Sequence, residues 1–256
     1  MLWNASSLIG FTIEANDGQI GTVQDLLFDD IDWVVRWLVV DTGDTAAEHK
    51  VLLPVSALGI PNASLHKFPV NLTMQQVHNS PDVELDLPVS RQIEEALYHF
   101  YGWAPYWRNS DTLLSNSIVK PLVIPLQSLE PNPTARDGAG AVLPESDPNL
   151  RSIAVVTQYN IHATDGNIGH IDDFLVQDDN WTIRYVIVDT RNWWPGEKVL
   201  VSPRAMREIN WEEKTFHLTV DRRMVKDSPV YDPSSTADGA YDEKFLKYFG
   251  VNWVEK

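Results

Sequence analysis

The sequence predicts a mainly β fold: two small tandem β-barrels, each followed by a short C-terminal α-helix, related by a pseudo-twofold axis. The first observation behind this prediction is a repeat. Residues 17–42 recur without a gap at 165–190, and 12 of the 26 positions are identical. The second observation is a series of short segments rich in Val, Ile, Thr and aromatic residues, with turn residues between them. About five or six short strands per repeat fit a small barrel or roll.

The repeat divides the chain of 256 residues into a first unit at 1–103 and a second at 153–256. Residues 104–152 lie between them and contain seven prolines and the run Asp137-Gly138-Ala139-Gly140, a composition typical of a linker. Each predicted unit has about 100 residues, which is enough to bury a working core.

The strands expected in the first unit are at 8–13, 20–28, 34–40, 50–53 and 64–70. Asp17-Gly18 precedes the second of these and suits a tight turn. Gly21, inside that strand, indicates a bulge or a close approach of another backbone. The run at 34–40 is apolar on both faces apart from Arg36, which is typical of a central strand.

Two helical segments are expected after these strands. Thr73 and Gln76 have the spacing of a capping box, at the start of a short helical turn that stops before Pro81. An i, i+3, i+4, i+7 pattern then predicts an amphipathic helix over about 90–101, with Gly102 as its C-cap. The apolar positions of this pattern are Ile93, Ala96, Leu97 and Phe100.

The second unit repeats this order of elements. Its strands are expected at 155–161, 168–176, 183–188, 198–201 and 215–220. Asp165-Gly166 takes the place of the first turn and Gly169 that of the glycine inside the strand. A helix near 242–249 corresponds to the helix at the end of the first unit.

Charge and composition exclude several classes of function. The formal net charge is −16, which argues against nucleic acid and anionic membrane surfaces as partners, because both need a basic face. There is no Cys, so disulfides and thiolate metal sites are excluded. No apolar run approaches the roughly 18 residues of a membrane span, and the N-terminal residues do not look like a signal peptide. A cytoplasmic location is therefore expected.

The repeated stretch resembles the PRC-barrel domain family. The resemblance lies in the pattern Asp-Gly-x-Ile-Gly-x-Val/Ile-x-Asp, the Asp-rich turn, and the Val-rich strand ending in Val-Asp-Thr, and it covers both units. The family is named for the barrel of the photosynthetic reaction centre H subunit and includes the C-terminal domain of the ribosome maturation factor RimM. The resemblance implies small barrels that assemble with protein partners, without the photosynthetic or RNA-associated role of those two proteins.

Both copies contain an Asp inside the long strand and an Arg in the next one: Asp25 with Arg36, and Asp173 with Arg184. A carboxylate on the core side of a strand needs a partner. We expect an ion pair with the Arg, or bonds from backbone N–H groups, that fixes the strand register. A catalytic acid at these positions is the alternative interpretation.

Metal and cofactor sites are not expected. The acidic turns have oxygen ligands at positions that suit a weak Ca²⁺ site, but they lack the spacing of an EF-hand. These turns consist of Asp29, Asp30 and Asp32, and of Asp178, Asp179 and Asn180. The seven His residues form no zinc-binding spacing, and no nucleophile elbow or phosphate-binding glycine loop occurs. Asp221-Arg222-Arg223 is expected to start a helix rather than to bind phosphate.

Aromatic clusters are the best candidates for a binding surface, because exposed Trp and Tyr favour interfaces. The candidate interface residues are Trp193, Trp194, Trp103, Tyr106 and Trp107. We therefore predict a non-enzymatic interaction or scaffold module with protein partners, present as a monomer with an internal pseudo-dimer or as a homo-oligomer. The alternatives are a ligand or cation sensor and, less favoured, a hydrolase that uses the paired carboxylates.

Overall fold

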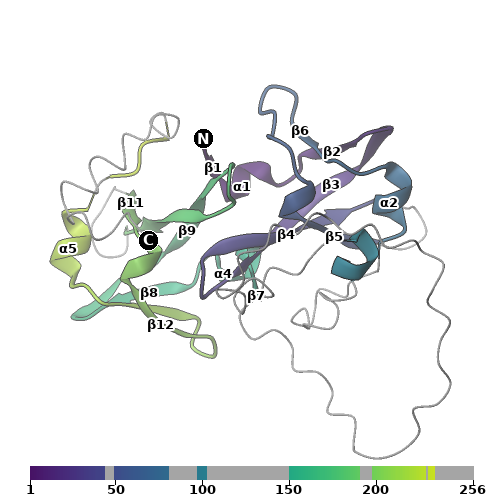
Figure 1. The fold of residues 1–256 in the computed structure, drawn as a ribbon. Helices are drawn as coiled ribbons and strands as arrows, with labels where there is room; N and C mark the ends of the chain where they lie inside the picture. Colours follow the sequence, from purple (N-terminus) through teal and green to yellow (C-terminus); the bar gives the residue numbers. More distant parts are fainter. Residues whose placement is uncertain (44–48, 81–96, 103–149, 191–197, 229, 234–256) are drawn as a thin grey trace, which may run out of the picture. The chain divides into compact units, whose positions relative to one another are not determined.

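The computed structural model describes residues 1–43, 49–80, 97–102, 150–190, 198–228 and 230–233. Residues 1–88 and 149–256 form one compact unit, and residues 89–148 form another. The described part of residues 1–88 and 149–256 contains two β-sheets and several short helices, so the protein is mainly β as predicted (Figure 1). None of the described helices has the length and apolar character needed to cross a membrane.

One sheet is built mainly from the N-terminal half and has the strand order β5-β4-β3-β2-β6, with β7 paired to β3. Its strands are β2 (Thr12–Ala15), β3 (Gly18–Asp29), β4 (Val34–Asp41), β5 (Lys50–Pro54), β6 (Lys67–Pro69) and β7 (Leu150–Ser152). All pairs are antiparallel except β2 with β6, which is parallel.

The other sheet is built mainly from the C-terminal half and has the order β11-β10-β9-β8-β13-β12, with β1 paired to β9. Its strands are β1 (Leu2–Asn4), β8 (Asn160–Ala163), β9 (Gly166–Gln177), β10 (Ile183–Asp189), β11 (Lys198–Val201), β12 (Met206–Asn210) and β13 (Thr215–Leu218). Here β8 with β13 is the parallel pair.

The strand pairing does not close either sheet into a barrel, which corrects the predicted architecture. Within the described residues, no ladder joins β5 to β6 or β11 to β12. The chain instead turns after β5 through the 3-10 helix η1 (Val55–Ala57), and two isolated bridges, Leu58 to Val70 and Asn62 to Lys67, bring it beside β6. After β11, η3 (Pro203–Ala205) makes the same turn and leads into β12, which pairs with β13.

Two of the predicted strands begin differently from the prediction. Residues 5–8 and 153–156 form the short helices α1 (Ala5–Leu8) and α4 (Ile153–Val156), although strands had been expected at 8–13 and 155–161. The Ile and Val residues of 153–156 favour a strand, but each of the two segments reverses the direction of the chain between two different strands and is helical instead. In α4 the Ser152 side chain accepts a hydrogen bond from the Val155 N–H and starts the helix.

Several local predictions are confirmed. Helix α2 (Met74–His78) has the complete capping box of Thr73 and Gln76. Residues 97–101 are helical, and Gly102 follows with φ +71°, as a C-cap requires. Helix α5 (Arg222–Lys226) begins after Asp221, whose side chain accepts from the Met224 N–H. Residues 90–96 and 242–249 lie outside the described part of the chain.

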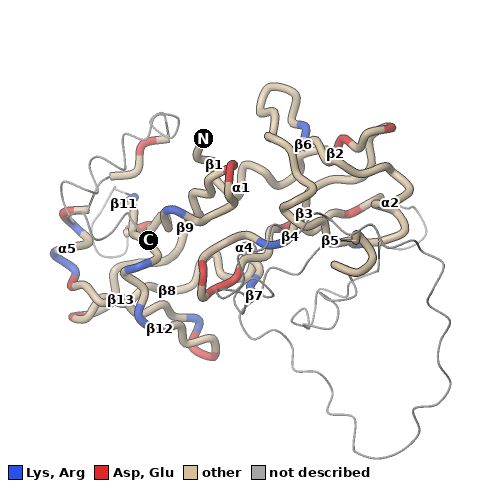
Figure 2. Tube along the Cα trace, in the orientation of Figure 1, with Lys and Arg blue, Asp and Glu red and all other residues tan. Residues whose placement is uncertain are grey.

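The core covers both faces of β4 and β10, in each of which several consecutive residues are fully buried. The largest fully buried side chains include Trp37, Phe28 and Phe68 in the first sheet, and Phe174 and Phe216 in the second. Figure 2 shows acidic and basic positions interspersed along the described chain, with Lys and Arg on α5 and next to β12. Residues of both signs are therefore spread along the described chain (Figure 2).

Candidate functional site

Each sheet contains one strand that comes from the other half of the chain. Strand β1 pairs with β9 in the register Leu2↔Gln177 to Asn4↔Leu175. Strand β7 pairs with β3 in the register Leu150↔Asp29 to Ser152↔Leu27. Positions 2 and 150 differ by the same 148 residues as the two copies of the repeat, so the two exchanges are equivalent. We refer to β1 and β7 as the exchanged strands.

The sheets are also joined where β4 and β10 begin. The Val35 N–H donates to the Trp181 carbonyl at 2.8 Å, and the Ile183 N–H donates to the Trp33 carbonyl at 2.7 Å. Because both Trp residues have positive φ, 57° for Trp33 and 61° for Trp181, the chain turns sharply before each strand. The two backbone bonds are reciprocal at a spacing of 148 residues.

The same two Trp rings pack across the junction. Trp33 lies 6.2 Å from Phe216, which belongs to the second sheet, and Trp181 stacks on Phe68 of the first sheet at 5.7 Å. Phe28 and Phe174 also meet, with ring centroids 5.8 Å apart. The core is therefore shared, since aromatic side chains of each half fill space in the other.

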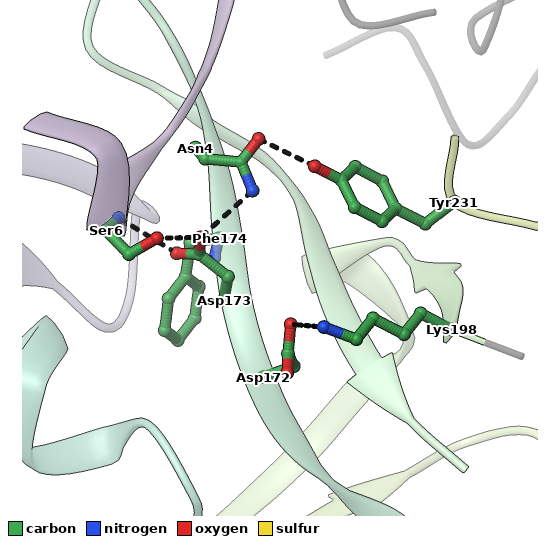
Figure 3. Close-up of polar contacts among 7 residues, drawn as sticks. All are labelled: Asn4, Ser6, Asp172, Asp173, Phe174, Lys198 and Tyr231. Atoms are coloured by element: carbon green, nitrogen blue, oxygen red, sulfur yellow. Dashed lines mark hydrogen bonds and ion pairs between the residues drawn. The ribbon is translucent and has the colours of Figure 1, made fainter. Parts of the chain in front are cut away.

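Asp173 lies at the centre of a polar cluster beside the first exchanged strand (Figure 3). Its Oδ2 accepts from Asn4 Nδ2 at 3.0 Å and from Ser6 Oγ at 2.5 Å. Its Oδ1 accepts from the backbone N–H groups of Ser6 at 3.1 Å and Phe174 at 2.8 Å. The residue is only 4% exposed, so four donors satisfy a buried carboxylate.

Asp25 forms the equivalent cluster at the second exchanged strand. Its Oδ2 accepts a short hydrogen bond from Ser152 Oγ, and its Oδ1 accepts from the N–H groups of Ala154 at 3.1 Å and Leu26 at 2.8 Å. Burial raises the pKa of the Asp25 carboxyl above its ordinary value and outweighs the hydrogen bonds from Ser152, Ala154 and Leu26, which lower it.

The predicted ion pairs Asp25–Arg36 and Asp173–Arg184 are wrong, whereas the backbone acceptor role is confirmed. Asp25 stands opposite Val39 in the β3–β4 ladder, three residues along from Arg36. Arg36 instead contacts Asp32 at 2.9 Å and Asp29 at 3.8 Å. In β10 the offset is the same, because Asp173 stands opposite Ile187 rather than Arg184.

The two clusters differ in their outer residues. At Asp173, Tyr231 donates its hydroxyl to Asn4 Oδ1 at 2.8 Å, and Lys198 binds Asp172 at 2.7 Å (Figure 3). Burial raises the pKa of the Tyr231 hydroxyl above its ordinary value. In the first copy the position of Asp172 is occupied by Gln24. The Asp173 cluster is thus the more elaborate of the two.

The remaining motif residues shape the turns of each copy. Asp17 accepts from the N–H of Met74 at 2.7 Å, and Asp165 accepts from the N–H of Arg222 at 2.8 Å, so each fixes the start of the helix that follows the sheet. The bond from Arg222 lowers the pKa of Asp165. Gly18 and Gly166, which begin β3 and β9, also have positive φ.

At Gly21 and Gly169 another stretch of backbone approaches closely. This is one of the two roles predicted for a glycine inside these strands. A Cβ atom on Gly21 would lie 2.3 Å from the Asp41 carbonyl oxygen, and one on Gly169 would lie 1.9 Å from that of Asp189. Both contacts are closer than real Cβ atoms allow, so only glycine fits.

The acidic turns are bound by protein groups. Asp29 accepts from the N–H groups of Ile31 and Asp32, and Asp30 forms an ion pair with Arg151 at 2.9 Å. Among the described residues, no group of three or more His, Asp and Glu side chains is arranged to hold a metal ion. A cation at the first turn would have to displace Arg36 and Arg151.

The sequence indicated the two central carboxylates but not the groups that bind them. Asn4, Ser6 and Ser152 precede the conserved part of the repeat, and Tyr231 follows it. The one signal was that Leu2 and Leu150 are identical at the spacing of the repeat. The candidate interface residues Trp193, Trp194, Trp103, Tyr106 and Trp107 lie outside the described residues.

Replacing Asp173 by Ala should lower the free energy of unfolding by about 3 kcal/mol, because the change leaves one buried and three partly buried donors without an acceptor. Urea denaturation followed by Trp fluorescence measures this loss. Asp172→Ala is the matched control: it removes a partly exposed ion pair from the neighbouring position and should cost at most about 1 kcal/mol. Equal losses in the two variants would contradict the role assigned to Asp173.

The raised pKa of Asp25 predicts a pH-dependent contribution to stability. The folded state holds this proton more tightly than the unfolded state, so the contribution is full below the unfolded pKa of about 3.8 and is lost as pH rises through the folded pKa. Relative to Asp25→Asn, the wild type should therefore become less stable as pH rises over this range, and the difference should be constant at higher pH. Urea unfolding of both proteins at several pH values measures this difference, and a difference that grew with pH would contradict the prediction.

Comparison with known proteins found a family match for the N-terminal part of the chain. The model of the PRC-barrel domain matches residues 4–67, which run from the end of β1 to the start of β6. No curated protein matches the chain. The match confirms the predicted resemblance to the PRC-barrel domain family over residues 4–67, which include the first copy of the repeated motif.

Proposed function

We propose that this protein is a non-enzymatic interaction module in which two PRC-type units act as one rigid body. A PRC-barrel domain suggests an interaction or scaffold role in general. The observation that carries the proposal is the reciprocal exchange of β1 and β7, because each sheet is completed by a strand from the other half. Two units held in this way present a fixed arrangement of surfaces to a partner.

Further contacts support the second unit as a relative of the first, arranged about a pseudo-twofold axis. Strands β3 and β9 have the same length of 12 residues and begin 148 residues apart. The exchanged strands, the backbone bonds at Trp33 and Trp181, and the contacts to Asp25 and Asp173 also recur at or close to this spacing. An isologous dimer has such paired contacts, and a duplicated chain can form them within one molecule.

The two units can be tested by producing residues 1–103 and 150–256 as separate chains. We expect neither half to be a folded monomer, because each lacks one strand and one aromatic partner. Mixed together, the halves should form a one-to-one complex with the circular dichroism and melting temperature of the full chain. The proposed arrangement would be overturned if light scattering gave the mass of a monomer for either half and circular dichroism showed that this half is stably folded.

The interaction role is tested by affinity capture from the native cell with the full chain as bait. One variant changes Trp193 and Trp194 to Ala. A second changes Ile60 and Leu65 to Ser, since these are exposed aliphatic side chains at 72% and 62%. The role is supported if a protein held by the wild type is lost by one variant and binds the purified chain. It fails if all three baits and an unrelated acidic protein retain the same set.

The arrangement of Asp25 and Asp173 favours this proposal over a hydrolase. A general acid or base needs a carboxylate that can reach a substrate, whereas Asp173 is buried and already accepts four hydrogen bonds. A calcium sensor is also less well supported, because Arg36 and Arg151 neutralise the first acidic turn. A rise in melting temperature on addition of Ca²⁺ would support a sensor instead.

A further inference from the structure

We propose that His162 and His217 form a binding site for a transition-metal ion, of the class Zn²⁺, Ni²⁺ or Cu²⁺, on the second sheet. The two residues are far apart in the sequence. The parallel pairing of β8 with β13 makes them direct neighbours. Their ring centroids lie 5.6 Å apart, with an angle of 80° between the ring planes.

Both rings are on the outer face of the sheet. Ile161 and Phe216, which precede them in the strands, are fully buried, so the alternation of a strand turns the two His side chains away from the core. Both His residues are partly exposed. An ion can therefore reach them from solvent without any opening of the fold.

The separation of the rings suits a shared ion. A Zn–N bond is about 2.1 Å long and the ring centroid lies about 1 Å further on, so two imidazoles on one ion have centroids roughly 5–6 Å apart. The angle of 80° between the ring planes means that the rings are not stacked, so the two planes cross and one ion can lie in both.

A second His pair has a ring arrangement that does not suit a shared ion. His49 and His78 have a similar separation of 5.5 Å, but their planes are stacked at 29°. The ion lies in the plane of each imidazole that binds it, and nearly parallel planes do not meet between the rings. His49 Nδ1 also lies 3.0 Å from Thr42 Oγ1. The geometry therefore favours the pair on β8 and β13.

The proposed site has two protein ligands and open positions. No third His, Asp or Glu of the described chain completes a closed cluster. Glu208 stands opposite His217 in the β12–β13 ladder, with its side chain 66% exposed and 3.8 Å from Arg207. Water fills the remaining positions in the isolated protein, which makes the binding weaker than that of a structural zinc site.

The first sheet has no counterpart of this site. The positions 148 residues before His162 and His217 are Glu14 and Pro69, neither of which supplies an imidazole. One ion per chain is therefore expected. The inference is independent of the proposed interaction role, because it rests on the register of two strands within one sheet.

The test is a titration of the full chain with Zn²⁺ and Ni²⁺ in a calorimeter, together with Cu²⁺ spectra by electron paramagnetic resonance. We expect one ion per chain, nitrogen coupling from two imidazoles, and weaker binding at pH 5, where protons compete for the ligands. His162→Gln and His217→Gln should each weaken binding about tenfold or more. Unchanged urea midpoints without metal would establish that the variants are folded.

His170→Gln is the matched control, because His170 lies on the neighbouring strand β9 opposite Asn160. It should bind the ions as the wild type does. The proposal is overturned if the wild type binds no ion, if either paired variant binds as tightly as the wild type, or if the control loses binding to the same extent.

Discussion

Replacing Gly169 by Ala is expected to lower the free energy of unfolding by about 4 kcal/mol, near the upper end for a single substitution. The new methyl carbon would lie 1.9 Å from the Asp189 carbonyl oxygen. That oxygen belongs to the backbone of the central strand β10, so it cannot move aside as a flexible side chain could. The φ of +134° at this position adds a second cost for any residue with a Cβ atom.

Gly10→Ala is the control for the conformational part of this cost. Gly10 has φ +82°, but nothing lies within 4 Å of the Cβ position. Its replacement should lower the free energy of unfolding by only about 1 kcal/mol, because a residue with a Cβ atom is less stable in the left-handed conformation. Urea denaturation of both variants measures the difference. If Gly169→Ala were no more destabilising than Gly10→Ala, the close approach of β9 and β10 would not exist in solution.

Replacing Trp181 by Ala should lower the free energy of unfolding by about 4 kcal/mol, as expected for a large buried ring. Trp181 is 6% exposed and stacks on Phe68 of the other sheet. Its removal therefore leaves a cavity at the junction rather than within one sheet, and both sheets should lose stability together. Chemical denaturation should remain a single transition in which fluorescence and circular dichroism coincide.

A double-mutant cycle with Phe68→Ala isolates the contact across the junction. The two losses should sum to more than the loss in the double variant, with a coupling energy of about 1 kcal/mol for the stacked pair. Additive losses would show that the two rings do not meet in solution. Trp33→Ala is a useful comparison, because Trp33 makes the reciprocal contact with Phe216 but is more exposed.

Local sequence patterns were sufficient to predict the positions of the long strands and of several helix ends. The alternation of apolar residues located β3, β4, β9 and β10 to within about two residues at each end. The capping box at Thr73 and the C-cap at Gly102 were also predicted from residue type and spacing. These features depend on interactions within a few residues, so the local sequence contains the information for them.

Local sequence patterns gave wrong predictions for segments whose structure depends on residues far away in the chain. The segment at 153–156 is helical although its Ile and Val residues favour strands, and the segment at 5–8 is helical up to the first residue of a predicted strand. They connect an exchanged strand in one sheet to the next strand in the other, and nothing in their composition records that connection. The expectation of closed barrels failed for a related reason, since strand propensity does not specify which edges pair.

For the candidate site too, the sequence predicted the central residues but not their distant partners. The repeat identified Asp25 and Asp173 as positions that need a partner, but it suggested Arg36 and Arg184 because they are the nearest charges of opposite sign. The register places each Asp three residues away from the position opposite its Arg. The true donors, at Asn4, Ser6, Ser152 and Ala154, come from the exchanged strands and the helices that follow them.

The sequence by itself determined the tandem pattern, the glycine positions that allow close backbone contact, and the presence of two carboxylates that need partners. Only the tertiary structure decided which strands complete each sheet, which groups bind the carboxylates, and that His162 and His217 are neighbours. The physical reason is that turns, caps and strand alternation depend on local geometry. Strand exchange and register instead depend on burial and hydrogen bonding between segments more than 100 residues apart, which no local pattern records.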